Sequence, residues 1–227
     1  MGFSLLVSYT FAKLLDDVTG NFAGETLSGT AFQSWHNLRA ERSLSALDTP
    51  QRLVVGYIWE LPLGAGKRYL AERWAGRVLG GWQIEGITTL AAGNVLGMTS
   101  ASNTTFSLGG GQRPHWAGRN PSLGKPSVDR WFNTEVFSQP PPYTFGNAPR
   151  TIPGLRGHGT RNLDFSLIKN TRAGERVNVQ FRAEFFNLFN TPRFDVPSTQ
   201  FGAQGFGVVS NQINLPRIIQ FGLKLMF

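Results

Sequence analysis

Apolar and polar residues alternate in six separate stretches of this chain, and each stretch predicts a β-strand. The clearest stretch runs from Val177 to Phe185, where every second residue is apolar and those between are polar or charged. Side chains alternate across a strand, so each stretch has one apolar face and one largely polar face. The predicted strands cover residues 3–11, 53–61, 82–90, 162–167, 177–185 and 219–227.

The connections between the predicted strands are alternately short and long. A moderate link spans residues 62–81, and a short one lies around 170–175, where Gly174 is the expected turn glycine. The other links are long and run from Leu14 to Arg52, from Ala91 to Arg161 and from Asn187 to Arg217. Loops beyond about 15 residues are uncommon in compact soluble domains, whereas short periplasmic turns and long extracellular loops are typical of outer-membrane barrels.

The predicted fold class is therefore all-β: an antiparallel transmembrane β-barrel segment, about six strands of a larger barrel, with long extracellular loops. A soluble β-sandwich shows the same alternation and remains the alternative fold. Several strands reach the roughly 9–11 residues that a tilted strand needs to cross a bilayer. Aromatic residues also gather near the predicted strand ends, where an interfacial girdle is expected. They are Trp59, Trp82, Phe185, Phe186, Phe189 and Phe227.

The composition agrees with the predicted β-barrel fold and excludes several kinds of segment and site. No stretch approaches the roughly 20 consecutive apolar residues of a membrane-spanning helix, and alternating strands average to the near-neutral mean hydropathy of −0.17. Cysteine is absent, which excludes disulfides, thiolate metal sites and a cysteine nucleophile. The net charge of +8 comes from basic residues that form no run. We therefore expect contact with outer-membrane lipid and lipopolysaccharide, and no nucleic acid as a partner.

No catalytic constellation is found in the sequence. His36, His115 and His158 lie in predicted loops without ligand-like spacing, so no metal site is expected. Asp16 and Asp17 have no base or nucleophile that the sequence identifies as a partner, and no nucleophile-elbow or zinc-protease motif occurs. We expect neither an enzyme nor a cofactor.

The middle loop carries aromatic residues among prolines and glycines. Displayed on an extracellular loop, they could stack on sugar rings or bind an apolar ligand; alternatively, they fold the loop on itself. The candidate ligand contacts are Trp116, Trp131, Phe132 and Tyr143.

The last eight residues resemble the terminal β-signal of outer-membrane proteins. A polar residue, a glycine two places later and apolar residues at the third-last and last positions make up that pattern, and here they are Gln220, Gly222, Leu225 and Phe227. The resemblance implies that the barrel-assembly machinery reads this strand. With the long links outside the cell, the last strand runs towards the periplasm and the C-terminus is periplasmic.

Further motifs resemble the distal barrel of Oar-like TonB-dependent outer-membrane transporters, which often carry a carboxypeptidase-regulatory-like domain. They are the stretches 37–42 (NLRAER), 48–53 (DTPQRL), 60–64 (ELPLG), 81–84 (GWQI), 131–133 (WFN) and 181–190 (FRAEFFNLFN). The resemblance implies a barrel of about 22 strands closed by a plug, with uptake powered through TonB. Residues 1–227 are then expected to be the C-terminal part of the barrel domain, without plug or TonB box, so TonB contact would occur only through a missing N-terminal region.

The start of the chain has no basic, apolar and small-residue pattern of a secretory signal. We therefore expect a fragment, or a true start other than Met1. The expected function is uptake of a bulky ligand, a glycan fragment or a chelated metal, by an integral protein of the bacterial outer membrane. The alternatives are a structural or adhesive outer-membrane barrel without transport, and a soluble carbohydrate-binding β-sandwich.

Overall fold

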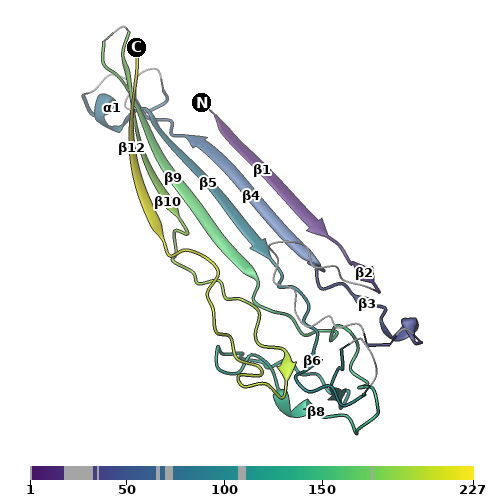
Figure 1. Ribbon diagram of the computed structural model, residues 1–227. Helices are drawn as coiled ribbons and strands as arrows, with labels where there is room; N and C mark the ends of the chain where they lie inside the picture. The colour runs from purple at the N-terminus through teal and green to yellow at the C-terminus, as the bar shows by residue number, and fades with distance from the viewer. Residues whose placement is uncertain are drawn as a thin grey trace.

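The computed structural model describes residues 2–17, 33–34, 36–64, 67–69, 74–106, 111–174 and 176–227. Its main feature is a single sheet of six long strands: β1 (Phe3–Phe11), β4 (Gln51–Glu60), β5 (Trp82–Ala91), β9 (Thr160–Arg172), β10 (Asn178–Phe186) and β12 (Ile218–Met226). The strands are antiparallel and adjacent in chain order, β1-β4-β5-β9-β10-β12 (Figure 1). An up-and-down meander of this kind is the connectivity of outer-membrane barrels.

All six predicted strands are confirmed, and five of them begin and end within two residues of the predicted bounds. The exception is β9, which continues to Arg172, five residues past its predicted end. The alternation breaks here because Ile168 lies on the otherwise polar side and Lys169 on the apolar side, although both still pair with β10. The turn consequently begins at Ala173 and not at Asn170 as predicted, with Gly174 at a φ of 91°.

In the observed register, apolar side chains lie beside apolar ones, and polar side chains beside polar ones, across the sheet. One row across all six strands is entirely apolar: Phe3, Trp59, Ile84, Leu167, Ala183 and Phe221. The adjacent row points to the opposite side and is mainly polar: Ser4, Ile58, Glu85, Ser166, Glu184 and Gln220. We call these two sides the apolar face and the polar face. Slipping any strand by one residue would exchange the two faces, so the pattern fixes the register.

In the described part of the chain, no second layer of secondary structure covers either face of the sheet. Among the described residues of these six strands, only Gly86, Ile168 and Ala183 are buried. On the apolar face, Phe221 is 68% exposed and Leu223 is 69% exposed. A β-sandwich needs a second sheet packed on the first, and the described residues form no such layer. The sandwich alternative is therefore wrong, and an apolar face of this extent is typical of a surface that contacts lipid.

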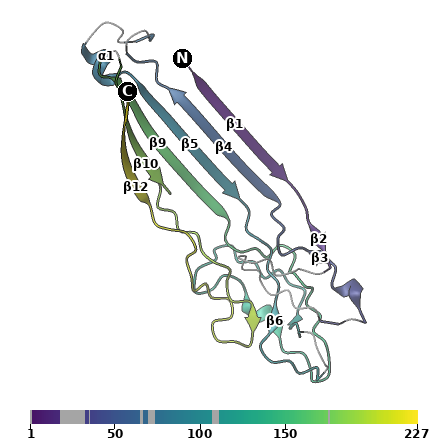
Figure 2. The same cartoon turned by 45° about the horizontal axis from the view of Figure 1, so that its top comes forward.

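The long links gather at one end of the sheet, and the two chain ends and α1 (Trp74–Leu79) lie at the other (Figures 1 and 2). We name residues 12–50 loop 1, residues 92–159 loop 2 and residues 187–217 loop 3, and together the loop module. Short elements occur within it: β2 (Leu15–Asp16), η1 (Leu38–Ala40), β3 (Ser43–Leu44), β6 (Thr99–Ser100), β7 (His115–Trp116), η2 (Thr134–Val136), β8 (Phe137–Ser138) and β11 (Gln200–Phe201).

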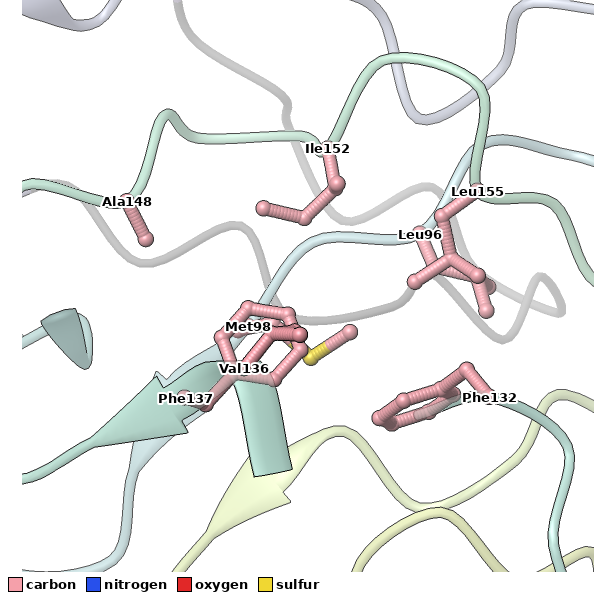
Figure 3. Packing of buried hydrophobic residues seen from close by; sticks show 8 residues of the cluster. All are labelled: Leu96, Met98, Phe132, Val136, Phe137, Ala148, Ile152 and Leu155. Atoms are coloured by element: carbon pink, nitrogen blue, oxygen red, sulfur yellow. The ribbon is translucent and has the colours of Figure 1, made fainter. Parts of the chain in front are cut away.

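The hydrophobic core lies in the loop module and not on the sheet. Its buried members all come from loop 2: Leu96, Met98, Phe132, Val136, Phe137, Ala148, Ile152 and Leu155 (Figure 3). Val196, Phe201 and Phe206 of loop 3 pack against them. The long links are therefore not loose chain, since they form a packed body at one end of the sheet.

Candidate functional site at the junction of the sheet and the loop module

Loops 2 and 3 are joined mainly by aromatic packing. The ring of Phe206 in loop 3 lies 5.2 Å from that of Phe132 and 5.9 Å from that of Phe137, both edge-on. Edge-to-face geometry at such distances is favourable beyond the area that the rings bury. A short parallel pairing of β6 with β11 adds backbone hydrogen bonds across the same seam. Loop 3 is thus fixed to loop 2 by an apolar contact.

Loops 1 and 2 are joined by ion pairs with a constant polarity, in which loop 1 supplies the carboxylate and loop 2 the arginine. The pairs are Glu41 with Arg113 at 3.0 Å, Asp48 with Arg156 at 2.6 Å, and Asp16 with Arg150. Each of them links segments far apart in the sequence, so together they position loop 1 against loop 2.

The pair of Glu41 and Arg113 is fully enclosed, with each side chain only 1% exposed. Both guanidinium NH groups of Arg113 donate to the carboxylate, at 3.2 and 3.0 Å. Burial lowers the pKa of Arg113, and the adjacent Glu41 carboxylate opposes that shift. Gln33 completes the site, because its Oε1 accepts from the Arg113 backbone at 2.8 Å while its Nε2 donates to Gly146. A two-point geometry of this kind offsets much of the desolvation of both charges.

Beneath the loop module, a cavity of about 820 Å³ opens on the polar face of the sheet. We call it the junction pocket. Its floor is one register row across four strands, formed by Thr10, Arg52, Ala91 and Thr160. All three loops contribute to the walls: Leu47 and Thr49 come from loop 1, and loops 2 and 3 supply, among others, Asn94, His158, Arg193, Phe194 and Asp195. The volume falls in the range of roughly 300–1,000 Å³ that is usual for ligand sites.

The junction pocket is cationic. Arg52 from β4 and Arg193 from loop 3 are both exposed to it, and within the described part of the chain neither guanidinium has a hydrogen-bonded or ion-paired partner. Asp195 is the one carboxylate among the lining residues, and its Oδ1 accepts from the Val196 backbone at 2.7 Å. Hydroxyl and amide groups from Thr and Asn side chains complete the polar lining. This donor-rich set suits a ligand with carboxylate or phosphate oxygens and hydroxyl groups.

His158 lies at the wall of the junction pocket, between the rings of Trp131 and Phe194 at 5.9 and 5.4 Å. Burial lowers the pKa of His158, the polarity of the adjacent Gly159 backbone opposes this shift, and the nearby cations Arg161 and Arg193 lower the pKa further. The imidazole is therefore biased to its neutral form, in which it both donates and accepts hydrogen bonds.

The predicted aromatic ligand contacts divide into two groups. Phe132 is 0% exposed and belongs to the core, so it offers no surface to a ligand in this arrangement. Trp116 and Trp131 are partly buried against the core, and their indole NH groups donate to the carbonyls of Arg119 and Arg156. Tyr143 alone is displayed, at 76% exposed. The structure does not bring the four together. Sequence reasoning did not single out Arg193, or Phe106, whose ring stacks on Tyr143, and it placed Arg52 only within the stretch 48–53, without a ligand role.

The four residues of the terminal signal lie on or beside the edge strand β12. Gln220 pairs with Glu184 and Gly222 with Arg182, both on the polar face. Leu225 pairs with Val179 on the apolar face, and Phe227 follows the strand and is fully exposed. Within the described residues, β12 is paired on one side only. Its reading by an assembly machinery stays a prediction.

Two other features, a metal-binding cluster and a membrane-spanning helix, are absent from the described residues. In the ranges that the structure describes, no group of three or more His, Asp or Glu side chains is arranged to hold a metal ion. Nor does any helix in those ranges have the length and apolar character needed to span a membrane.

Comparison with known proteins agrees with the geometry. The family model described as an outer membrane beta barrel domain matches residues 1–220. No curated protein and no solved structure matches the chain. The family accounts for the meander, for the uncovered apolar face and for the alternation of short and long links. The chain belongs to the outer membrane beta barrel domain family, and its place is the outer membrane.

Proposed function

We propose that this chain forms part of the wall of an outer-membrane transporter that takes up a bulky, negatively charged, hydroxyl-bearing ligand, such as an acidic glycan fragment or an anionic metal chelate. The observation that carries the proposal is the junction pocket, where Arg52 and Arg193 face a cavity on the polar face with no partner among the described residues. Two cations against a single carboxylate in a cavity of ligand size favour an anionic ligand. No catalytic role is part of the proposal.

The proposed orientation places the loop module outside the cell and the C-terminus in the periplasm. Long links on the outside and short turns on the inside are the usual arrangement in this class. The charged residues of the apolar face support a membrane between the two ends, because Arg161 lies at the loop-module end of β9 and Lys169 nearer its other end, opposite Trp82. The Lys169 ammonium lies 5.0 Å from the Trp82 ring centre, as expected for a pair at the headgroup level.

The open edges support a larger barrel. Strands β1 and β12 each have one edge without a strand partner among the described residues. Backbone groups unpaired in lipid are costly, so spanning sheets close on themselves. We propose that further strands complete the barrel, that the apolar face contacts lipid and lipopolysaccharide, and that the barrel-assembly machinery recognises β12. In the same proposal, TonB acts through a plug region that lies outside residues 1–227.

Uptake by cells carrying the full-length gene tests the proposal. Wild-type cells, deletion cells and cells with Arg52→Ala/Arg193→Ala would receive a partial hydrolysate of an acidic polysaccharide and an iron–catecholate chelate, with depletion from the medium followed by mass spectrometry. We expect depletion of one of these probes that needs the gene, stops with a protonophore and slows about tenfold in the double variant. The matched control Arg119→Ala/Lys125→Ala removes two exposed cations of loop 2 outside the pocket and should retain uptake. Equal depletion by deletion cells would contradict the proposal.

The alternative is an adhesive or structural barrel, and the packed loop module is the observation that favours it. A rigid outer body with a core of its own can serve as a binding surface without any transport. In that case cells would retain a probe at their surface, and the protonophore would have no effect. This result in the uptake experiment would replace transport by adhesion.

A further inference from the structure

Two aromatic rings of loop 2 lie in water although the loop module has a core that could bury them. Phe106 is 72% exposed and Tyr143 is 76% exposed. The two rings are stacked on each other, with 4.8 Å between their centres and 30° between their planes. They come from separate segments of loop 2, so the pair exists only because the fold brings those segments together.

The backbone at both residues is held in a conformation that large side chains rarely adopt. Phe106 has a φ of 57° and Tyr143 a φ of 64°, a region in which large side chains are strained. The other described non-glycine residues with positive φ are asparagines, which tolerate this region well. Strain of this kind persists only where the surroundings impose it, and it concentrates at functional sites.

The surroundings that impose it are polar and buried. The Tyr143 backbone NH donates to the Thr104 carbonyl at 2.8 Å. Gln112, which is 1% exposed, accepts from the Thr104 backbone at 2.9 Å and donates to the Thr144 carbonyl at 2.8 Å. One buried amide thus ties together the two segments that carry the rings. The aromatic pair is a fixed platform and not a mobile tip.

The rim of this platform is polar but uncharged. Residues 101–106 read ASNTTF and residues 139–145 read QPPPYTF, with no Asp, Glu, Lys or Arg in either. The rim carries amide and hydroxyl groups on Asn103, Thr104 and Gln139, which are held in place by hydrogen bonds within the rim, such as Gln139 Nε2 donating to Thr104 Oγ1 at 3.2 Å. These two described segments offer no counter-charge to an acidic or basic ligand, whereas a flat ring with apolar faces and hydroxyl groups at its edge would match both the aromatic pair and its polar rim.

We propose that Phe106 and Tyr143 form a surface platform that binds an uncharged sugar ring of a polysaccharide. This binding goes beyond uptake, because it takes place at the surface of loop 2, apart from the cationic junction pocket, and needs no energy source. It is therefore measurable on the purified protein, and its failure would leave the uptake experiment unaffected.

Calorimetric titration of the full-length protein in detergent tests the platform. The probes are neutral hexasaccharides of the glucan, xylan and mannan types, with hexagalacturonate as the acidic probe. We expect at least one neutral probe to bind, and Phe106→Asn and Tyr143→Asn each to weaken it about tenfold, since one ring stacks on the sugar with its outer face and the other supports that ring from behind. Asparagine keeps the positive φ, so the backbone is retained.

Leu38→Asn, which removes another exposed apolar side chain in loop 1, is the matched control and should leave binding unchanged. Absence of binding by every neutral probe, equal weakening by the control, or binding of hexagalacturonate alone would each overturn the proposal. Capture of a protein partner that survives Tyr143→Asn, without any sugar binding, would also overturn it.

Discussion

The sheet and the loop module differ in whether the chain itself buries their apolar side chains. Phe221 and Leu223 on the sheet leave more than two-thirds of their surface open, whereas Phe132 and Ile152 in the loop module have none. The loop module therefore has an interior of its own, with both apolar and ionic contacts. The sheet has no such interior among the described residues, which agrees with an apolar face in contact with lipid and with our proposal that further strands close its edges. The loop module is thus suited to water, and the apolar face of the sheet is suited to lipid.

The largest expected effect comes from breaking the buried ion pair of Glu41 and Arg113, which should destabilise the loop module and leave the sheet intact. Arg113→Met leaves the enclosed Glu41 carboxylate without its counter-charge, with only the Gln33 backbone NH, among the described residues, still donating to it, which should cost the loop module about 3–5 kcal/mol. Hydrogen exchange of loop 2 amides in the full-length protein would measure the loss, while heat-modifiable migration should report an intact barrel. Arg130→Met removes an ion pair whose partners are exposed, and it should change exchange by less than about 1 kcal/mol. Equal effects of the two variants would contradict the special role of the buried pair.

A charge on the apolar face should instead destabilise the sheet and leave the loop module intact. Phe221→Arg places a guanidinium near the middle of β12 on the face assigned to lipid, at a cost of about 2–4 kcal/mol. The fraction of folded protein in outer-membrane extracts should fall, while the loop module keeps its exchange protection in the molecules that do fold. The control Gln220→Arg adds the same charge on the polar face of the same strand and should be tolerated. Loss of folding in both variants would remove the distinction between the faces.

A smaller change tests how well the core of the loop module is packed. Ile152→Val removes one methylene from a side chain with no exposed surface and should cost about 0.5–1.5 kcal/mol. Ile213→Val makes the same deletion in a half-exposed side chain of loop 3 and should have little effect. Hydrogen exchange of loop 2 amides in both variants measures the difference. Equal protection in the two variants would mean that the core is loosely packed.

The smallest effect concerns pH at the junction pocket. Because the pKa of His158 is lowered in the folded state, the unfolded state binds the proton more readily. The contribution of this residue to stability is therefore present above its ordinary pKa and is lost as the pH falls through that value towards the folded one. Exchange protection around Gly157 and Phe194 should weaken between pH 7.5 and 5.5, by less in His158→Gln than in the wild type. An equal decline in both would assign the effect to the carboxylates.

The sequence was sufficient for the sheet because the information there is local. Alternation over nine or ten residues sets the faces, and the links set the order, so β1 was predicted to the residue. Its one failure, the extension of β9, occurs where Ile168 and Lys169 reverse the alternation while pairing with neighbouring strands continues.

The loop module was not predictable, because its contacts join residues that lie far apart in the sequence. Glu41 and Arg113 meet across 72 positions, and no period relates them. Nor could the pattern separate Phe132 from Tyr143, since both are aromatic residues among prolines and glycines. Which of them is buried depends on long-range closure of loop 2, including the hydrogen bonds of Gln112. That Arg52 and Arg193 have no partner among the described residues likewise depends on the three-dimensional arrangement around the junction pocket.

The central claim, that one face of the sheet meets lipid and the other an aqueous lumen, is tested most directly by labelling. The chain contains no cysteine, so single cysteines at successive positions 180–185 of β10 can each carry a spin label in outer-membrane vesicles. We predict strict alternation. Labels at Phe181, Ala183 and Phe185 should collide with lipid-soluble oxygen, and labels at Gln180, Arg182 and Glu184 with a water-soluble nickel chelate. Uniform access of the nickel chelate at all six positions would contradict the membrane-spanning sheet.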